Sequence, residues 1–235
     1  MTKAWEDPRI AAGMPVQLAE RRRRIAAGET PLGWKVGFGA PAALERMKLK
    51  GPLVGHLMVS GRLTSGGTAS LAGWVKPVAE PEIAVTIGRD VPGDADRAIA
   101  AACIAAIGPA IELADLNPPP DDLTQTLTGN IYQRHVILGP SDAGRAGCRL
   151  DGLTGIVTRS GGEMARTTEL TMNTGDPIEI VRHVAGTLAA YGEKLGAGDV
   201  VICGSVTPPV FLEPSDTAFG FALEPIGSVS INLKS

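Results

Sequence analysis

Residues 80–89 have the sequence EPEIAVTIGR, and this stretch indicates the class of fold. From Pro81 to Arg89 the pattern alternates and is rich in β-branched residues, over a length typical of one strand. Glu80 and Glu82 stand two positions apart at its start, and residues two apart on a strand share a face. The sequence therefore predicts a strand that carries two carboxylates on one side of its first residues.

A second apolar stretch, GPAIELAD at residues 108–115, predicts a strand over 109–114 that contains Glu112. Further strands are predicted at residues 33–38, 53–62, 134–138, 155–160, 163–167, 199–203, 218–223 and 228–233. Helices are predicted at residues 15–27, 41–48 and 94–107, and the longest helix at residues 177–194. Strands outnumber helices, and strand and helix do not alternate regularly as they do in a parallel α/β fold.

Composition supports the same fold class. The 235 residues include 30 glycines and 18 prolines, more breakers than a long helical bundle tolerates. Hydrophobic residues make up 44% and charged residues 20%, which excludes disorder as the main state. We expect an α+β fold with a helical segment at residues 1–32 and one domain at residues 33–235.

Charge and cysteine content narrow the function classes. The net charge is −3, and the one basic run, Arg21–Arg24, is expected to be the solvated face of a helix. Cys103, Cys148 and Cys203 are too scattered for a disulfide framework or a zinc site, which favours a reducing compartment. No apolar run reaches membrane-spanning length. We expect a cytoplasmic protein with no nucleic-acid or membrane partner.

Common catalytic motifs are missing. The sequence contains no GxGxxG, GxxxxGK[ST] or GxSxG, so a nucleotide-binding fold and a serine nucleophile elbow have no support. His56, His135 and His183 lie in unrelated contexts, and each is expected to be an ordinary structural residue unless other evidence places it at a site.

The three glutamates in apolar strands are the main chemical signal. Glu80 and Glu82 repel each other on one face, and Glu112 is costly to bury alone. A shared divalent cation such as Mg²⁺ or Mn²⁺ would satisfy all three, because these ions prefer hard oxygen ligands. The alternative is that Glu80 and Glu82 are exposed at a strand end and that Glu112 pairs with an arginine.

Lys35 is the second candidate. It lies in GWKVG, between glycine and apolar residues, at residues 33–37. Its ammonium could extend to solvent, which is the more common arrangement, or it could face the carboxylates or an anionic substrate.

These residues carry a family resemblance. GWKVG around Lys35, EPEIAV at residues 80–85 and AIELAD around Glu112 resemble segments of the fumarylacetoacetate hydrolase superfamily. The resemblance is to its branch of 2-keto-4-pentenoate hydratases and 4-oxalocrotonate decarboxylases. Further matching segments follow in order: PLVGHL, GDPIEIVRHVA, VICGSVTPPV and IGSVSINL.

The resemblance implies a mixed β-roll core with flanking helices, and a homo-oligomer. It implies Mg²⁺ or Mn²⁺ as the cofactor and a small 2-oxo or 2-hydroxydienoic acid as the substrate. The residues that it assigns are Glu80, Glu82 and Glu112 as metal ligands, Lys35 as a catalytic and substrate-binding residue, and Asn130, Ser205 and Thr207 as substrate-binding residues.

The reaction expected first from this resemblance is addition of water to 2-hydroxypenta-2,4-dienoate, to give a 4-hydroxy-2-oxo acid in the catabolism of aromatic compounds. The first alternative is decarboxylation of a 4-oxalocrotonate-type 2-oxo acid. The remaining alternatives are a C–C hydrolase of a diketo acid and a non-catalytic homologue that binds a keto acid.

The sequence departs from the family pattern at a position that bears on which reaction is catalysed. Hydratases of this type carry an Asp in a Pro-Asp-Phe-Gly-like stretch, and this chain has Leu53 and Val54 between Pro52 and Gly55. We therefore expect His56 to lie beside the substrate and activate water, since neutral imidazole is a base near pH 7. Arg134 or His135 could instead receive a second carboxylate.

Overall fold

The computed structural model describes residues 3–235. Its helices are α1 (Pro8–Ala26), α2 (Pro41–Met47), α3 (Arg97–Cys103), α4 (Leu123–Thr128) and α5 (Pro177–Ala190). Short 3₁₀ turns lie at η1 (Ala4–Glu6), η2 (Val59–Gly61), η3 (Asn130–Tyr132) and η4 (Ala143–Arg145). The strands are β1 (Pro31–Gly37), β2 (Leu53–Met58), β3 (Arg62–Leu63), β4 (Thr68–Ser70), β5 (Pro77–Ile87), β6 (Ile104–Asp115), β7 (Gln133–Leu138), β8 (Thr154–Arg159), β9 (Gly162–Thr167), β10 (Val200–Ser205), β11 (Val210–Phe211), β12 (Ala218–Glu224) and β13 (Gly227–Lys234).

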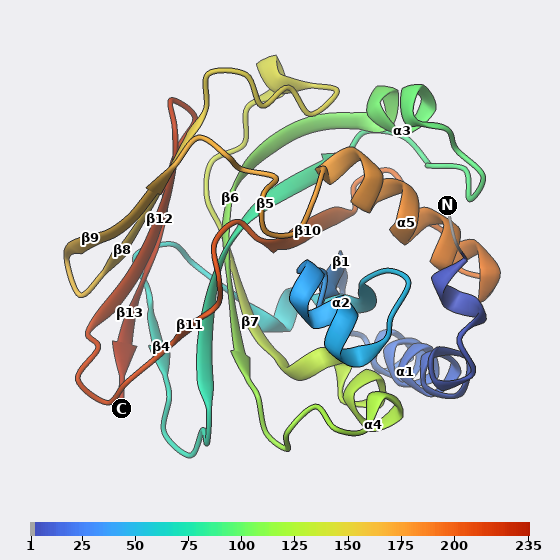
Figure 1. Ribbon diagram of the computed structural model, residues 1–235, viewed down its shortest axis with the longest axis horizontal. Helices are drawn as coiled ribbons and strands as arrows, with labels where there is room; N and C mark the ends of the chain where they lie inside the picture. The colour runs from blue at the N-terminus through green and yellow to red at the C-terminus, as the bar shows by residue number, and fades with distance from the viewer. Residues whose placement is uncertain (1–2) are drawn as a thin grey trace.

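A large mixed sheet forms the body of the fold. Its eight strands run in the order β2-β1-β10-β5-β6-β7-β3, and β11 pairs with β5. The long, curved β5 and β6 cross the molecule as an antiparallel pair (Figure 1). A smaller sheet of five strands, β4-β13-β12-β8-β9, lies on the left in this view, and helices α1, α3 and α5 lie on the right. The predicted α+β fold with a mixed-sheet core and flanking helices is therefore confirmed.

The large sheet has two chemically different faces. On one face, directly paired residues place Lys35 opposite Gly55 and Glu80 opposite Glu112. The same face carries a small apolar cluster of five buried residues, Leu57, Ala84, Ala110, Val136 and Ile202. Residues of opposite parity, such as Trp34 and Ile111, belong to the main hydrophobic core. Because successive side chains of a strand point to opposite faces, only every second residue lies on the same face as the three glutamates.

Two helices differ from the prediction. The helix predicted at residues 15–27 begins at Pro8, because Asp7 accepts a hydrogen bond from the backbone N–H of Arg9 and caps it. With 19 residues, α1 and not α5 is the longest described helix, and Pro15 lies inside it. The helix predicted up to residue 194 ends at Ala190.

The predicted helix at residues 94–107 is wrong in its second half. Asp96 caps α3 by accepting from Ile99, but the helix ends at Cys103 and β6 starts at Ile104. The alanine-rich residues after it pair with β5, and their burial between neighbouring strands overrides their helical propensity.

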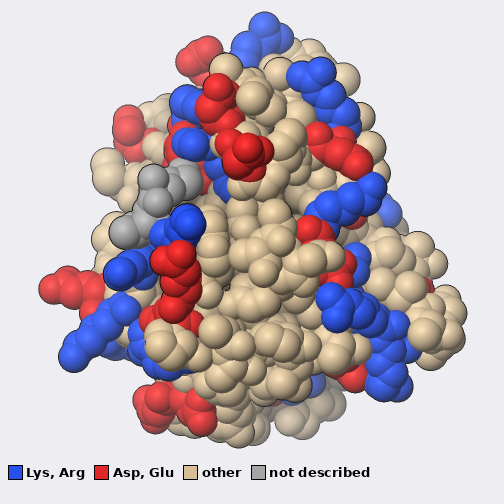
Figure 2. All heavy atoms as spheres, turned by 90° about the vertical axis from the view of Figure 1, so that its right-hand side faces the viewer, with Lys and Arg blue, Asp and Glu red and all other residues tan. Residues whose placement is uncertain are grey.

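Figure 2 shows the side of the molecule that carries α1, α3 and α5, with charges of both signs placed around a broad uncharged area. None of the helices in residues 3–235 has the length and hydropathy needed to cross a bilayer. The three cysteines are buried and free.

Candidate active site

The β5–β6 pairing brings the three predicted glutamates together. Glu80 lies directly opposite Glu112, and Glu82 follows two residues along the same face of β5. One carboxylate oxygen from each residue lies within 4.8 Å of the others. Glu82 and Glu112 are fully buried, whereas Glu80 is partly exposed to a cavity. The alternative in which Glu80 and Glu82 are solvated at a strand end is therefore excluded.

The hydrogen bonds of this cluster leave two carboxylate oxygens without partners. Oε2 of Glu82 accepts from the backbone N–H of Gly204 at 2.5 Å, and Oε1 of Glu112 accepts from the ammonium of Lys35. Within residues 3–235, Oε1 of Glu82 and Oε2 of Glu112 have no hydrogen-bond donor although both are buried. Unpaired buried carboxylate oxygens are costly, and a hard divalent cation is the group that fits this donor set.

The electrostatics of the cluster lead to the same conclusion. Burial, reinforced by the nearby charge of Glu112, raises the pKa of Glu80 to about 7. Burial, with the charges of Glu112 and Glu80, raises the pKa of Glu82 well above its usual range. The ammonium of Lys35 opposes both shifts without cancelling them. Three adjacent carboxylates beside one ammonium need further positive charge if all are to be ionised.

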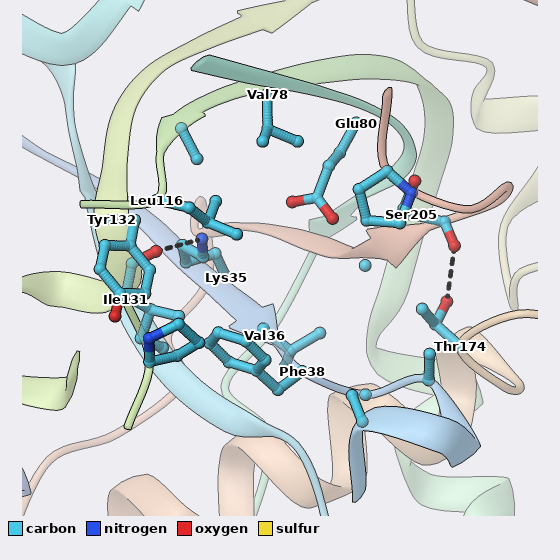
Figure 3. A pocket seen from close by; sticks show the side chains of 18 of the residues that line it. Lys35, Val36, Phe38, Val78, Glu80, Leu116, Ile131, Tyr132, Thr174 and Ser205 are labelled. Carbon is cyan, nitrogen blue, oxygen red and sulfur yellow. Dashed lines mark hydrogen bonds between the residues drawn. The ribbon is translucent and has the colours of Figure 1, made fainter. Parts of the chain in front are cut away.

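Lys35 reaches this cluster from β1. It is 2% exposed, and its Nζ donates to Glu112. The same Nζ donates to the backbone oxygen of Ile131 at 3.3 Å (Figure 3). Gly55 stands opposite Lys35, and a Cβ there would lie 3.0 Å from Cγ of Lys35 and 2.9 Å from Oδ1 of Asn130. The glycine leaves room for the lysine stem, so the alternative of a solvent-directed Lys35 is excluded.

Asn130 does not face the cavity. Its Oδ1 accepts from the backbone N–H of His56 at 2.8 Å, and its Nδ2 donates to the backbone oxygen of His56 at 2.9 Å. Asn130, Ile131 and Tyr132 all have left-handed backbones, with φ of 54°, 52° and 64°. This turn delivers the Ile131 oxygen to Lys35. The expectation that Asn130 binds substrate is corrected, because both ends of its amide are already used by β2.

His56 lies on the wrong face for the role expected of it. It pairs with Trp34, one position out of phase with the Lys35–Gly55 pair, so its ring lies on the opposite face of the sheet from Lys35. Burial, with the nearby charges of Arg24 and Arg21 on α1, lowers its pKa to about 4. Both ring nitrogens are buried without a partner in the described chain. The prediction that His56 activates water beside the substrate is not supported by this geometry.

Ser205 at the end of β10 and Thr207 in the loop that follows lie differently with respect to the cavity. Ser205 lines the cavity, and its buried Oγ has no hydrogen-bond partner in the described structure. Thr207 is not part of the cavity wall, and its Oγ1 donates to the backbone oxygen of Pro208 at 3.3 Å. The expectation of a substrate contact is therefore retained for Ser205 and corrected for Thr207.

The cavity has a volume of about 310 Å³, and several of its residues were not predicted. Asn173 donates to the backbone oxygens of Ser205 and Thr207, and Thr174 donates to that of Ser205, so this loop fixes the end of β10. Arg46 and Lys76 also line the cavity. Of these residues, only Lys76 could have been found from the sequence. It lies an even number of positions before Glu80, and such residues share a face of an extended strand.

Arg134 and His135 lie elsewhere. Arg134 pairs with Asp115 at 3.4 Å, and its guanidinium carbon lies 5.9 Å from the centroid of the Trp74 ring, on which His135 is stacked. Neither residue lines the cavity, so the suggestion that they receive a second substrate carboxylate is corrected.

Comparisons with known proteins identify the family of this chain. The model of the fumarylacetoacetate (FAA) hydrolase C-terminal family matches residues 57–232. The 2-hydroxyhexa-2,4-dienoate hydratase of Comamonas testosteroni is 28% identical over 221 residues, which cover 92% of this chain and 83% of that protein. The 4-oxalocrotonate decarboxylase of Pseudomonas sp. strain CF600 is 27% identical over 220 residues, with 92% and 83% covered.

Solved structures show the same fold. The 4-oxalocrotonate decarboxylase of Pseudomonas putida G7, complexed with magnesium and adipate, superimposes with a TM-score of 0.83 at 24% identity. The superposition covers 92% of this chain and 83% of that one. The fumarylpyruvate hydrolase of Pseudomonas aeruginosa, in complex with Mn²⁺ and pyruvate, gives 0.67 at 14% identity over 87% and 89% of the two chains. With a family model that spans most of its length and relatives that align over nearly all of it, the chain belongs to the fumarylacetoacetate hydrolase C-terminal family.

Proposed function

We propose that the protein is a metal-dependent lyase for small 2-oxo and 2-hydroxydienoic acids, and that it hydrates 2-hydroxypenta-2,4-dienoate in the breakdown of aromatic compounds. One observation carries the proposal. Glu82 and Glu112 each have a buried, unpartnered carboxylate oxygen, and their neighbours Glu80 and Lys35 line a cavity large enough for a small acid. Glu80, Glu82 and Glu112 would hold Mg²⁺ or Mn²⁺, which polarises the 2-oxygen of the substrate and stabilises negative charge there.

Lys35 and Ser205 are the groups of this chain available to the substrate. The ammonium of Lys35 is held by Glu112 and Ile131, so it can pair with a substrate carboxylate or pass a proton from Nζ. In hydration, the enol gives up its O–H proton, carbon 5 gains a proton, and water then adds hydroxyl to carbon 4 and hydrogen to carbon 3. The Oγ of Ser205 is free to donate to a substrate oxygen.

Decarboxylation of a 4-oxalocrotonate-type acid is the second candidate, and a specific observation favours it. Among the described residues, the wall of the cavity contains neither histidine nor aspartate. Hydration needs a group that activates water, whereas loss of CO₂ does not. The polarised 2-oxo group accepts the electron pair left by the departing carboxylate, and the carbon that lost it is then protonated.

The test is a panel of substrates with the metal-stripped protein and added Mg²⁺ or Mn²⁺. The panel contains 2-hydroxypenta-2,4-dienoate, 2-oxohex-3-enedioate and fumarylpyruvate, and covers hydration, decarboxylation and C–C hydrolysis. Loss of the conjugated ultraviolet absorption measures turnover, and product analysis identifies the reaction. Hydration of the first compound supports the proposal, and CO₂ release from the second without hydration of the first favours the decarboxylase.

Two variants control this test. Glu112→Gln should weaken Mn²⁺ binding about tenfold or more, since loss of even a supporting residue has that effect. Glu169→Gln, at an exposed turn, should bind Mn²⁺ as the unchanged protein does. Tight metal-dependent binding of pyruvate without turnover of any compound would indicate a non-catalytic homologue. We also retain a cytoplasmic location and a homo-oligomeric state as proposals.

A further inference from the structure

The loop before α5 holds the end of β10 in place. Nδ2 of Asn173 donates to the backbone oxygen of Ser205 at 2.7 Å and to that of Thr207 at 2.9 Å. Oγ1 of Thr174 donates to the same Ser205 oxygen at 3.3 Å (Figure 3). Gly204 has a φ of 84°, and a Cβ there would lie 2.9 Å from Cγ2 of Thr174. The loop therefore packs closely on the strand and fixes the position of the Asn173 amide.

The hydrogen bonds of Asn173 determine which end of its amide is free. A side-chain amide has two donor hydrogens on its nitrogen, whereas its oxygen only accepts. Nδ2 directs its hydrogens at two backbone oxygens, and the reversed amide would place its oxygen against these two acceptors. Oδ1 receives no hydrogen bond from residues 3–235, and it is accessible to solvent. Because Asn173 lines the cavity, its wall carries an amide oxygen that needs a donor.

Ser205 provides a second unpartnered group on the neighbouring part of the wall. The residue is 2% exposed and lines the cavity, and its Oγ has no hydrogen-bond partner in the described chain. Ser205 pairs with Glu82 in the sheet, so this part of the wall adjoins the glutamate cluster. A hydroxyl can donate and accept, whereas the Asn173 oxygen only accepts. A group that satisfies both must carry an O–H, as water and alcohols do.

Only one of the two candidate reactions uses such a group. In hydration, the oxygen of water bonds to carbon 4 and one proton of the water leaves. The electron pair of the double bond between carbons 3 and 4 moves toward the 2-oxo group, and carbon 3 then gains a proton. The reacting water and the new 4-hydroxyl each have an O–H to donate. Loss of CO₂ neither consumes water nor forms a hydroxyl group.

We propose that Oδ1 of Asn173, with Oγ of Ser205, holds the water that adds to carbon 4 and then binds the 4-hydroxyl of the product. This inference rests on the proposed function, because it takes the carboxylate and the 2-oxygen of the substrate to be bound at the glutamate cluster. Asn173 thereby favours hydration over decarboxylation, since it binds the reactant that only hydration uses.

The experiment compares the binding of 4-hydroxy-2-oxopentanoate and 2-oxopentanoate, which differ in the 4-hydroxyl. Dissociation constants are measured by calorimetry on the Mn²⁺-loaded protein. We expect the hydroxy acid to bind about fivefold more tightly, the effect of one neutral hydrogen bond. Asn173→Leu is similar in size but has no acceptor, so the two acids should bind equally. The variant should still bind 2-oxopentanoate as the unchanged protein does, and its kcat for hydration should fall.

Two further variants separate the amide oxygen from the structural role of the loop. Asn173→Asp keeps an acceptor oxygen but loses both donor hydrogens, so it should lower Tm and keep the preference for the hydroxy acid. Thr174→Val removes the bond from Oγ1 to the backbone of Ser205 and leaves Asn173 unchanged. It should also lower Tm without changing the ratio of the two dissociation constants.

The outcomes distinguish this inference from the proposed function. Equal Mn²⁺-dependent affinity for both acids in the unchanged protein, or a preference that survives in Asn173→Leu, overturns the role of Asn173 and leaves the proposed function standing. A preference that disappears in Thr174→Val as completely as in Asn173→Leu also overturns it, because the fold of the loop would then set the ratio. If neither acid binds to the Mn²⁺-loaded protein, the proposed function fails and the inference fails with it.

Discussion

Replacement of Lys35 by methionine should destabilise the metal-free protein much more than the metal-loaded protein. The lysine is 2% exposed and donates to Glu112 and Ile131, so methionine fills most of its space but leaves Glu112 without its cation. Removal of one partner of a buried ion pair costs about 3–5 kcal/mol. For a protein of 235 residues, each kcal/mol lowers Tm by about 2–4 °C, so we expect a fall of roughly 6–20 °C.

The assay is thermal unfolding of Lys35→Met and the unchanged protein, in EDTA and in saturating Mn²⁺. A divalent ion at the glutamates supplies the missing positive charge, so Mn²⁺ should recover most of the lost stability. Lys194→Met is the control, because its exposed ion pair should change the free energy of unfolding by less than about 0.5 kcal/mol. An equal loss of Tm with and without Mn²⁺, or no loss in EDTA, would refute the reasoning.

Three further predictions concern pH, His56 and Asn130. Burial raises the pKa of Glu80 to about 7 and raises the pKa of Glu82 well above its usual range, so the metal-free protein should lose stability as pH rises through the pKa of Glu80. Mn²⁺ binding should strengthen over the same interval with release of protons, which calorimetry in buffers of different ionisation enthalpy measures. His56→Leu should keep Mn²⁺ affinity and kcat within about twofold, as its ring faces α1; a loss of turnover on this substitution contradicts the assignment of its face. Asn130→Gly keeps the left-handed backbone but removes two hydrogen bonds, so chemical denaturation should show a loss of about 1–3 kcal/mol and kinetics a lower kcat; unchanged kcat would separate this turn from Lys35.

The strand around PEIAVTI was predictable because its alternation is a local property. Parity alone placed Glu80 and Glu82 on one face, and their opposition to Glu112 follows once β5 and β6 pair. The structure gathers these carboxylates, and their role as metal ligands stays a prediction. The boundary between residues 32 and 33 also stays a prediction.

The face on which His56 lies could not be predicted, because it depends on the register between β1 and β2. His56 and Gly55 are adjacent in sequence, but only one of them can share the face of Lys35. The sequence does not state which residue of β2 stands opposite Lys35. The expected role of Asn130 depended on distant partners in the same way. The motif identified the residue, but its amide binds the backbone of His56, which is 74 residues away in the sequence.

The helix predicted at residues 94–107 failed because local propensity competed with pairing. Alanines at residues 100–102 continue a helical pattern, and Ala105 and Ala106 extend it. In the fold, the residues from Ile104 onward complete a buried strand between β5 and β7, and this requirement comes from partners distant in sequence. Arg46, Asn173 and Thr174 could not be predicted for the same reason, since a short helix and a loop bring them to the cavity.

The two candidate reactions make different demands on Glu80. It is the partly exposed member of the cluster and the acidic residue on the cavity wall, so it is the group closest to the role of a base for water. A carboxylate that binds a cation is a weaker base, and the same residue cannot serve fully in both roles. Hydration therefore needs a further base or a shared role for Glu80, whereas decarboxylation needs only the electron-accepting end of the substrate and a proton donor such as Lys35. Because His56 faces α1, Glu80 is the acidic group on the described cavity wall that hydration by this protein would have to use as its base.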